Sequence, residues 1–132
     1  MKLASMSHVA RDIIENRRNG IRSLYAFITD QTPPKADIKY WTQFLNQETP
    51  VYLGAEKIAM KFNMAVVFFN IRKTGRGKYI LKPELLFDDC SGLADHDITE
   101  AHVRKLEELI VNKPEYWIWS HRRWKYKKPA DA

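Results

Sequence analysis

The sequence contains a single cysteine, Cys90, among its 132 residues. One cysteine excludes an intrachain disulfide and a cysteine-based zinc site, which indicates a reducing compartment or indifference to redox state. No apolar run approaches the roughly 18 residues that suggest a transmembrane helix, and residues 1–12 lack the long apolar core of a signal peptide. We therefore expect the chain itself to be soluble or peripheral.

Motifs for several common chemistries are also missing. There is no Gly-x-Ser-x-Gly turn, and Cys90 has no histidine within its own segment, so nothing supports a serine or cysteine nucleophile. The glycines around Arg76 are too few for a nucleotide-binding loop and are explained by a hairpin turn. His96 lies between two aspartates in a segment typical of a solvated turn, so we do not expect a metal site there.

Acidic residues are scarce at the C-terminus. Lysine and arginine number 22 against 16 aspartate and glutamate residues, giving a net charge of +6. Residues 121–128 hold five of these bases and no acid. Nucleic acid, anionic lipid and an acidic carrier protein all fit this charge.

The order of apolar and turn residues predicts one α/β domain over residues 1–132, with a small mixed sheet flanked by helices. The expected helices cover residues 7–19, 55–63 and 99 to Pro114. The expected strands are a buried strand at 21–29, a buried strand at 65–69 and an edge strand at 79–87, the last two joined by a hairpin turn at 72–78. Residues 35–54 read as a long, aromatic-rich loop.

The basic aromatic segment 114–128 is the most distinctive part of the sequence. Arg122 and Arg123 can each bind a phosphate through two nitrogens, Lys125 adds a charge, and tryptophan suits the boundary between apolar and wet regions. A phospholipid or glycolipid surface fits these properties, and so does nucleic acid. The simplest alternative is aromatic core residues followed by a solvated tail.

The run from Pro114-Glu115 through Trp117 and Trp119 to His121–Lys125 resembles the C-terminal signature of the bacterial lipid A biosynthesis lauroyl and myristoyl acyltransferases. Trp124 stands where that family usually has phenylalanine. Two further pieces agree in order: Asp30-Gln31 after a predicted strand, and the stretch from Thr49-Pro50 to Gly54. The resemblance covers about residues 21–128.

The resemblance implies the later half of a glycerolipid-acyltransferase-like fold. It implies transfer of a fatty acyl chain from acyl carrier protein to a hydroxyl of a lipid A precursor, at the cytoplasmic face of the inner membrane, without metal or organic cofactor and without nucleic acid. Asp30 is then a supporting catalytic residue, and the substrate-binding residues are Gln31, His121, Arg122, Arg123 and Lys125.

The family's defining motif is a histidine followed five positions later by an acid, and it is expected before Asp30. His8 has Ile13 at that position, whereas His102 and Glu107 match the spacing only within a predicted helix. We therefore expect a C-terminal part of an acyltransferase that is inactive alone. The alternatives are a non-catalytic basic domain that binds anionic lipid or nucleic acid, and a chain whose exposed strand edges are completed by another protein.

Overall fold

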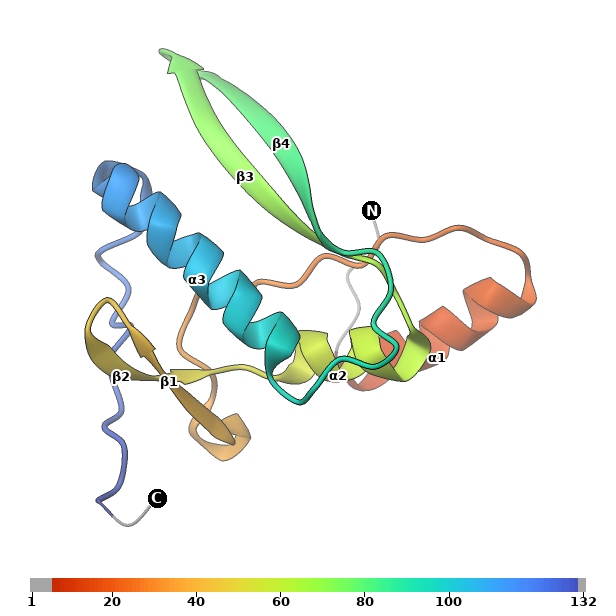
Figure 1. Ribbon diagram of the computed structural model, residues 1–132. Coiled ribbons are helices and arrows are strands. Elements are labelled where there is room, and N and C mark those ends of the chain that lie inside the picture. The colour runs from red at the N-terminus through yellow and green to blue at the C-terminus, as the bar shows by residue number, and fades with distance from the viewer. Residues whose placement is uncertain (1–5, 131–132) are drawn as a thin grey trace.

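The computed structural model describes residues 6–130, with side chains from His8 onward. Three helices and two small antiparallel hairpins make up the described part of the chain (Figure 1). In chain order the elements are α1 (Met6–Arg18), η1 (Lys35–Asp37), β1 (Tyr40–Phe44), β2 (Gln47–Val51), α2 (Gly54–Phe62), β3 (Val66–Gly75), β4 (Lys78–Phe87), α3 (Asp97–Asn112) and η2 (Pro114–Tyr116).

The three helices confirm the sequence prediction to within about two residues at most ends. α1 stops where Gly20 adopts a φ of 67° and Ile21 N–H bonds back to the Asn16 carbonyl. Glycine tolerates that left-handed conformation, which closes the helix. Asn63 ends α2 in the same way with a φ of 43°. Pro114 follows the end of α3 and begins the short η2 turn.

A hairpin occupies much of the segment that the sequence predicts as a loop. β1 and β2 pair over five residues each, and the turn between them places Leu45 and Asn46 at φ values of 49° and 60°. Two consecutive left-handed residues make the turn that matches the twist of a hairpin, but leucine rarely adopts it. The Glu107 carboxylate on α3 accepts the Leu45 N–H at 2.6 Å and holds the turn in place. The loop prediction for residues 35–54 is therefore wrong.

The second hairpin, β3–β4, is longer and projects away from the body of the protein (Figure 1). Its Gly75 to Lys78 turn confirms the predicted hairpin, and β4 is an edge strand of a two-stranded sheet as expected. β3 extends to Gly75, well beyond the predicted end at Phe69. It is only partly buried, because β4 is its one strand neighbour among the described residues.

The core lies between β1–β2 and α3, and a smaller one lies beside α2. The larger cluster joins Phe44 and Val51 of the hairpin to Val103 and Ile110 of α3. Trp117 and Trp124 pack against it from the C-terminal segment. In the smaller cluster Ala59, Cys90 and Ile98 are buried together. Cys90 is free and buried, as expected of a structural cysteine.

The prediction of a buried strand at residues 21–29 is wrong. This segment forms neither a helix nor a strand, and Leu24 and Ile28 are 74% and 80% exposed. A strand buried on both faces needs neighbours that complete its hydrogen bonds, and no described strand pairs with it. The single mixed sheet is wrong for the same reason, since the two hairpins form separate sheets. The fold is mixed α/β with two antiparallel pairs.

Among residues 6–130, no helix has the length and apolar character needed to cross a membrane.

Candidate functional site

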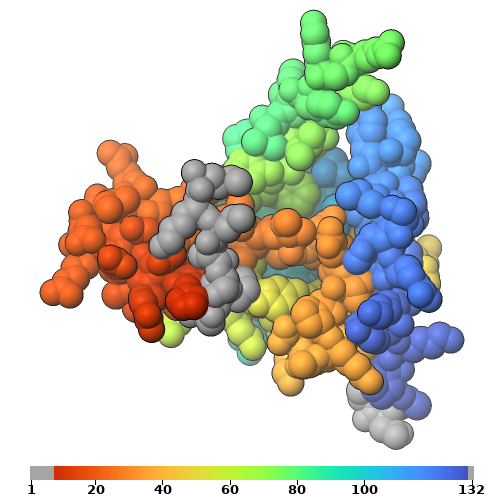
Figure 2. All heavy atoms as spheres, turned by 180° about the vertical axis from the view of Figure 1, so that it is seen from behind, coloured from red at the N-terminus to blue at the C-terminus, as the bar shows by residue number. Residues whose placement is uncertain are grey.

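Thr32 brings the two ends of the predicted site together. Its backbone N–H donates to His121 Nε2 at 3.0 Å. Its hydroxyl lies 2.7 Å from the Arg123 carbonyl oxygen and 3.0 Å from that of Arg122. In the view from behind, the orange residues that precede η1 run across the molecule from α1 to the blue C-terminal residues (Figure 2). Asp30-Gln31 and the basic segment are thereby held side by side.

A cleft of about 470 Å³ opens at this junction. Thr32, Pro33 and Pro34 form one wall, and the other wall is formed by Ser120, His121, Arg122, Lys125 and Tyr126. Neither wall contains a carboxylate, and Arg122 and Lys125 are exposed to solvent. Guanidinium and ammonium groups in an open cleft suit a phosphate. Three of the predicted binding residues, His121, Arg122 and Lys125, line this cleft.

Arg123 differs from its neighbours because it is only 3% exposed. Among the described residues, its buried Nε and Nη1 atoms have no hydrogen-bond partner. Its guanidinium carbon lies 5.8 Å from the centre of the Phe44 ring, which gives a cation–π contact. Burial lowers the pKa of Arg123 to about 10, and the nearby Asp30 carboxylate opposes that shift. Arg123 therefore faces the interior rather than the cleft.

Asp30 lies close enough to act electrostatically on two titratable groups, His102 and Arg123. Burial lowers the pKa of His102, while a hydrogen bond to the Thr99 backbone and the Asp30 charge oppose that effect and Arg123 adds to it. The His102 Nε2 atom lies 2.9 Å from the Thr29 hydroxyl, next to Asp30 in the chain. The Asp30 carboxylate, the His102 imidazole and the Arg123 guanidinium thus lie within electrostatic range of one another, near α3 and the C-terminal segment. The sequence did not predict His102 as a member of this group.

The spacing match between His102 and Glu107 does not place the two side chains together. Five residues turn a helix by about 140° beyond one full turn, so the residues lie on different faces of α3. Glu107 bonds the Leu45 N–H and pairs with Arg104 at 2.5 Å. His102 instead contacts Thr29. The interpretation of this match as coincidental is consistent with the geometry.

Trp124 anchors the basic segment to the first hairpin. Its indole N–H donates to the Thr49 hydroxyl at 2.8 Å, and that hydroxyl donates to the Gln47 carbonyl at 2.8 Å. Thr49 is fully buried. A phenylalanine could fill the same space but could not donate this bond. Two of the three sequence pieces that carry the resemblance, around Thr49 and around Trp124, are therefore in direct contact.

A buried carboxylate of α2 lies at the start of α3, and no pattern in the sequence indicated it. Glu56 of α2 accepts the His96 N–H at 2.9 Å and the Thr99 N–H at 2.7 Å, which satisfies free donors of the helix N-terminus. The His96 ring stacks on Tyr40 with 3.8 Å between the ring centres. His96 therefore makes structural contacts, whereas the sequence predicted a purely solvated turn. His96 and Glu56 are 40 residues apart in the sequence, so no local pattern indicates their contact.

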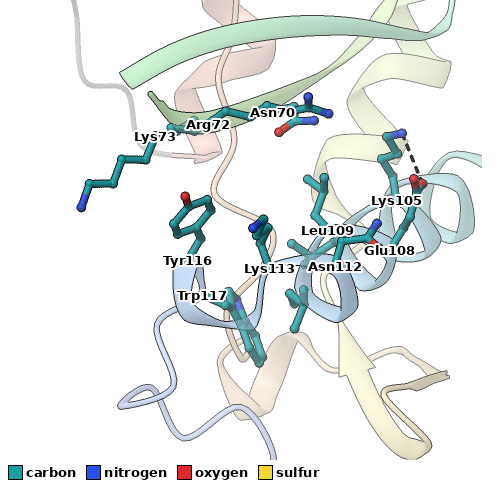
Figure 3. Close-up of a pocket in the computed structure, with 13 residues that line it drawn as sticks. Asn70, Arg72, Lys73, Lys105, Glu108, Leu109, Asn112, Lys113, Tyr116 and Trp117 are labelled. Carbon is teal, nitrogen blue, oxygen red and sulfur yellow. Dashed lines mark hydrogen bonds and ion pairs between the residues drawn. The ribbon is translucent and has the colours of Figure 1, made fainter. Parts of the chain in front are cut away.

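A second cavity, of about 410 Å³, lies between β3, the last turns of α3 and η2 (Figure 3). Tyr116 and Trp117 stand on one side, Asn70 on the strand side, and Lys105 pairs with Glu108 at 3.3 Å on the helix. None of the predicted site residues lines this cavity. Its lining mixes apolar residues of α3 and β3 with polar and charged ones, among them Arg72, Lys73 and Lys113.

The described residues contain no group of three or more His, Cys, Asp or Glu side chains that could hold a metal ion. The expectation that no cofactor is needed therefore stays a prediction.

A basic cleft next to a carboxylate and an imidazole fits a protein that binds an anionic substrate close to groups able to orient a proton. The sequence model of the bacterial lipid A biosynthesis acyltransferase family matches residues 4–126, and the chain belongs to this family. The predicted family resemblance is confirmed. Comparisons with curated proteins and with solved structures give no match.

Proposed function

We propose that this chain is the C-terminal part of an acyltransferase that moves a fatty acyl chain from acyl carrier protein to a hydroxyl of a lipid A precursor. The family match over residues 4–126 carries the proposal. The contacts of Thr32 with His121, Arg122 and Arg123 support it, because they join the sequence pieces of the resemblance into one site. The proposed place of action is the cytoplasmic face of the inner membrane.

The cleft beside Thr32 is the proposed site for an anionic group of the acceptor. Arg122 can bind a phosphate through two nitrogens, and Lys125 adds a mobile charge. The exposed Gln31 side chain lies one residue from Asp30 and can bond to a sugar hydroxyl. His121 keeps its place in the cleft wall through the Thr32 N–H.

Asp30 is the proposed supporting catalytic residue, and its charge acts on the buried guanidinium of Arg123. Because Arg123 is buried, its proposed contribution to substrate binding is indirect: it fixes the wall in which Arg122 and Lys125 stand.

The histidine and acid that activate the hydroxyl are proposed to come from a part of the enzyme outside this chain. None of the four histidines offers the required acid, since His8, His96 and His121 have Ile13, Ala101 and Tyr126 at the fifth position. Glu107 has the right spacing from His102 but points to Leu45. The chain alone is therefore proposed to be inactive.

Binding of the acceptor tests the cleft. The full chain should bind a phosphorylated lipid A precursor in detergent micelles, measured by calorimetric titration. Arg122→Ala combined with Lys125→Ala should weaken binding about tenfold or more, because charged hydrogen bonds to phosphate contribute about 1.5–3 kcal/mol each. Lys127→Ala is the matched control, since it removes an exposed base outside the cleft. Equal losses of affinity in both variants would mean that overall charge, and not the cleft, determines binding.

An activity assay tests whether the catalytic histidine and acid lie outside this chain. The chain incubated with acyl-acyl carrier protein and the precursor should give no product by mass spectrometry. Transfer that disappears in His102→Ala would contradict the proposal and place the base within this chain. Tight binding of single-stranded DNA at physiological salt, with no binding of the precursor, would favour the non-catalytic nucleic-acid alternative.

A further inference from the structure

Thr32 contacts three consecutive residues of the C-terminal segment. Its backbone N–H donates to the His121 ring, and its hydroxyl lies within 3.0 Å of the carbonyl oxygens of Arg122 and Arg123. The same three residues form a tight turn, in which the Arg123 N–H donates to the His121 carbonyl at 2.9 Å. Because a turn of this size has one internal hydrogen bond, the contacts of Thr32 help to hold its shape.

This turn sends two neighbouring arginines in different directions. Arg122 is exposed and lines the basic cleft, whereas Arg123 is 3% exposed and lies over the Phe44 ring. The direction of a side chain follows from the backbone that carries it. By bonding to the carbonyls of both residues, the Thr32 hydroxyl therefore also determines which of the two arginines reaches the cleft.

The contact between Thr32 and His121 fixes the form of the ring. A backbone N–H can only donate, so His121 Nε2, at 3.0 Å, accepts and carries no proton. The neutral ring then has its proton on Nδ1, since the bond at one ring nitrogen sets the state of the other. No hydrogen bond among the described residues uses this Nδ1–H group. His121 lines the cleft together with Arg122 and Lys125, so the group is available to a ligand there.

We infer that Thr32 is a positioning residue of the basic cleft. Its N–H holds His121 as a neutral imidazole that offers Nδ1–H to a phosphate oxygen, and its hydroxyl holds the turn that directs Arg122 into the cleft. The anion is thus bound by two full charges, from Arg122 and Lys125, and by one neutral donor. The inference deepens the proposed function and rests on it, because it takes the cleft as the site for an anionic group of the acceptor.

A positively charged His121 is the main alternative, because a third charge would also attract phosphate. Protonation places a hydrogen on Nε2, where it would face the Thr32 N–H. Two donors cannot form a hydrogen bond with each other, so the ring would have to leave Thr32. The other charged and titratable groups near the ring are Arg122, Lys125 and Tyr126 in the cleft, and Asp30, two residues before Thr32.

Nuclear magnetic resonance of the free chain tests the form of the ring directly. In protein labelled with nitrogen-15, His121 at pH 8 should show a protonated Nδ1 and an unprotonated Nε2, the reverse of the form that an unrestrained imidazole favours in water. As the pH is lowered to 5, the Thr32 amide proton signal should move toward that of a weaker hydrogen bond, together with the His121 ring signals. A proton on Nε2 at pH 8 would overturn the inference.

Two substitutions of His121 separate the roles of its two nitrogens. The amide oxygen of glutamine can replace Nε2, and the amide nitrogen of asparagine can replace Nδ1. His121→Gln should keep the Thr32 amide signal, without its change between pH 8 and pH 5. It should also bind the phosphorylated precursor about tenfold more weakly at pH 8, because a donor to a charged group is lost. His121→Asn should lose the Thr32 hydrogen bond at both pH values. If the Thr32 signal still changed with pH in His121→Gln, the change would belong to other groups, and the role of His121 would be contradicted.

The hydroxyl of Thr32 has a conservative control. Thr32→Val removes the hydroxyl and keeps the N–H, so the precursor should bind about fivefold more weakly, the effect of one neutral hydrogen bond. Thr32→Ser keeps both groups and should bind within about twofold of the natural chain. Equal losses of affinity in the two variants would overturn the role of the hydroxyl. Failure of the natural chain to bind the precursor would contradict the proposed acceptor site, whereas the form of His121 in the free chain decides the role of Thr32 separately.

Discussion

The two hairpins of this protein have opposite relations between sequence and burial. β1–β2 is short and rich in polar residues, yet Phe44, Thr49 and Val51 are no more than 1% exposed. β3–β4 has strands twice as long and richer in large apolar residues, yet much of it projects from the body of the protein. Apolar composition did not decide which hairpin forms the core.

Contacts from distant segments account for the difference. α3 packs on the first hairpin through Val103 and Ile110, Glu107 holds its turn, and Trp124 bonds to Thr49. The second hairpin meets α3 through Lys105, which pairs with Glu84, and through His102 beside Phe68, and only the end with Val66 and Phe87 reaches the smaller core cluster. The sequence of a strand therefore indicates whether its faces need to be covered. The structure shows which covering elements are present among the described residues.

The largest effect is expected from truncating one phenylalanine in each hairpin. Phe44→Ala should lower the free energy of unfolding by about 3–5 kcal/mol, because it leaves a cavity between Val51 and Val103. Phe69→Ala should cost less than about 1 kcal/mol, since Phe69 is 37% exposed. Urea denaturation measures both. Similar losses would mean that the second hairpin is as well packed in solution as the first.

A smaller effect should come from the link between the C-terminal segment and the first hairpin. Trp124→Phe removes the donor to Thr49 and should cost about 1 kcal/mol in urea denaturation. The control is Trp119→Phe. Trp119 also donates, to the Pro114 carbonyl at 2.6 Å, but it is 54% exposed, so water can replace that bond. Its loss should stay below about 0.5 kcal/mol. If Trp119→Phe costs more, the Thr49 contact is not the anchor.

An effect that depends on pH is expected at His102 on α3, whose ring lies 6.4 Å from that of Phe68 in β3. Burial lowers the pKa of His102 in the folded state below its usual 6.5. As the pH falls below 6.5, the unfolded chain takes up this proton first, so stability should decline by at most about 1.4 kcal/mol per pH unit.

Thermal unfolding between pH 7 and pH 5 measures this decline. His102→Gln keeps a group that can bond to Thr29 but cannot be protonated, so its stability should depend less on pH than that of the natural protein. An unchanged pH dependence in this variant would assign the effect to other groups.

Local signals in the sequence predicted much of the helical structure. The left-handed positions of Gly20 and Asn63 and the proline at 114 fix helix ends through their own backbone preferences, without help from distant residues. The Gly75 to Lys78 turn follows from the same kind of local chemistry. The β1–β2 turn escaped prediction because its left-handed Leu45 depends on Glu107, which lies 62 residues away.

The candidate site likewise has one part that the sequence predicted and one part that it did not. The types and order of Asp30, His121, Arg122 and Lys125 marked a basic site and a family before any geometry was known. The burial of Arg123 and the place of His102 next to Thr29 depend on how residues 29–34 cross α3 and the C-terminal segment. Contacts between residues roughly 70–90 positions apart leave no periodic pattern in the sequence.

The extended segment between Gly20 and Thr29 has a consequence for the integrity of the chain. Proteases bind their substrates in extended form, so the exposed bond after Arg22 is a natural point of tryptic cleavage. A single cut there need not release α1, because Val9 and Ile13 are buried and the Arg17 guanidinium lies over the Phe62 ring. A protein nicked at this bond would migrate as two pieces in denaturing gels and as one particle in solution.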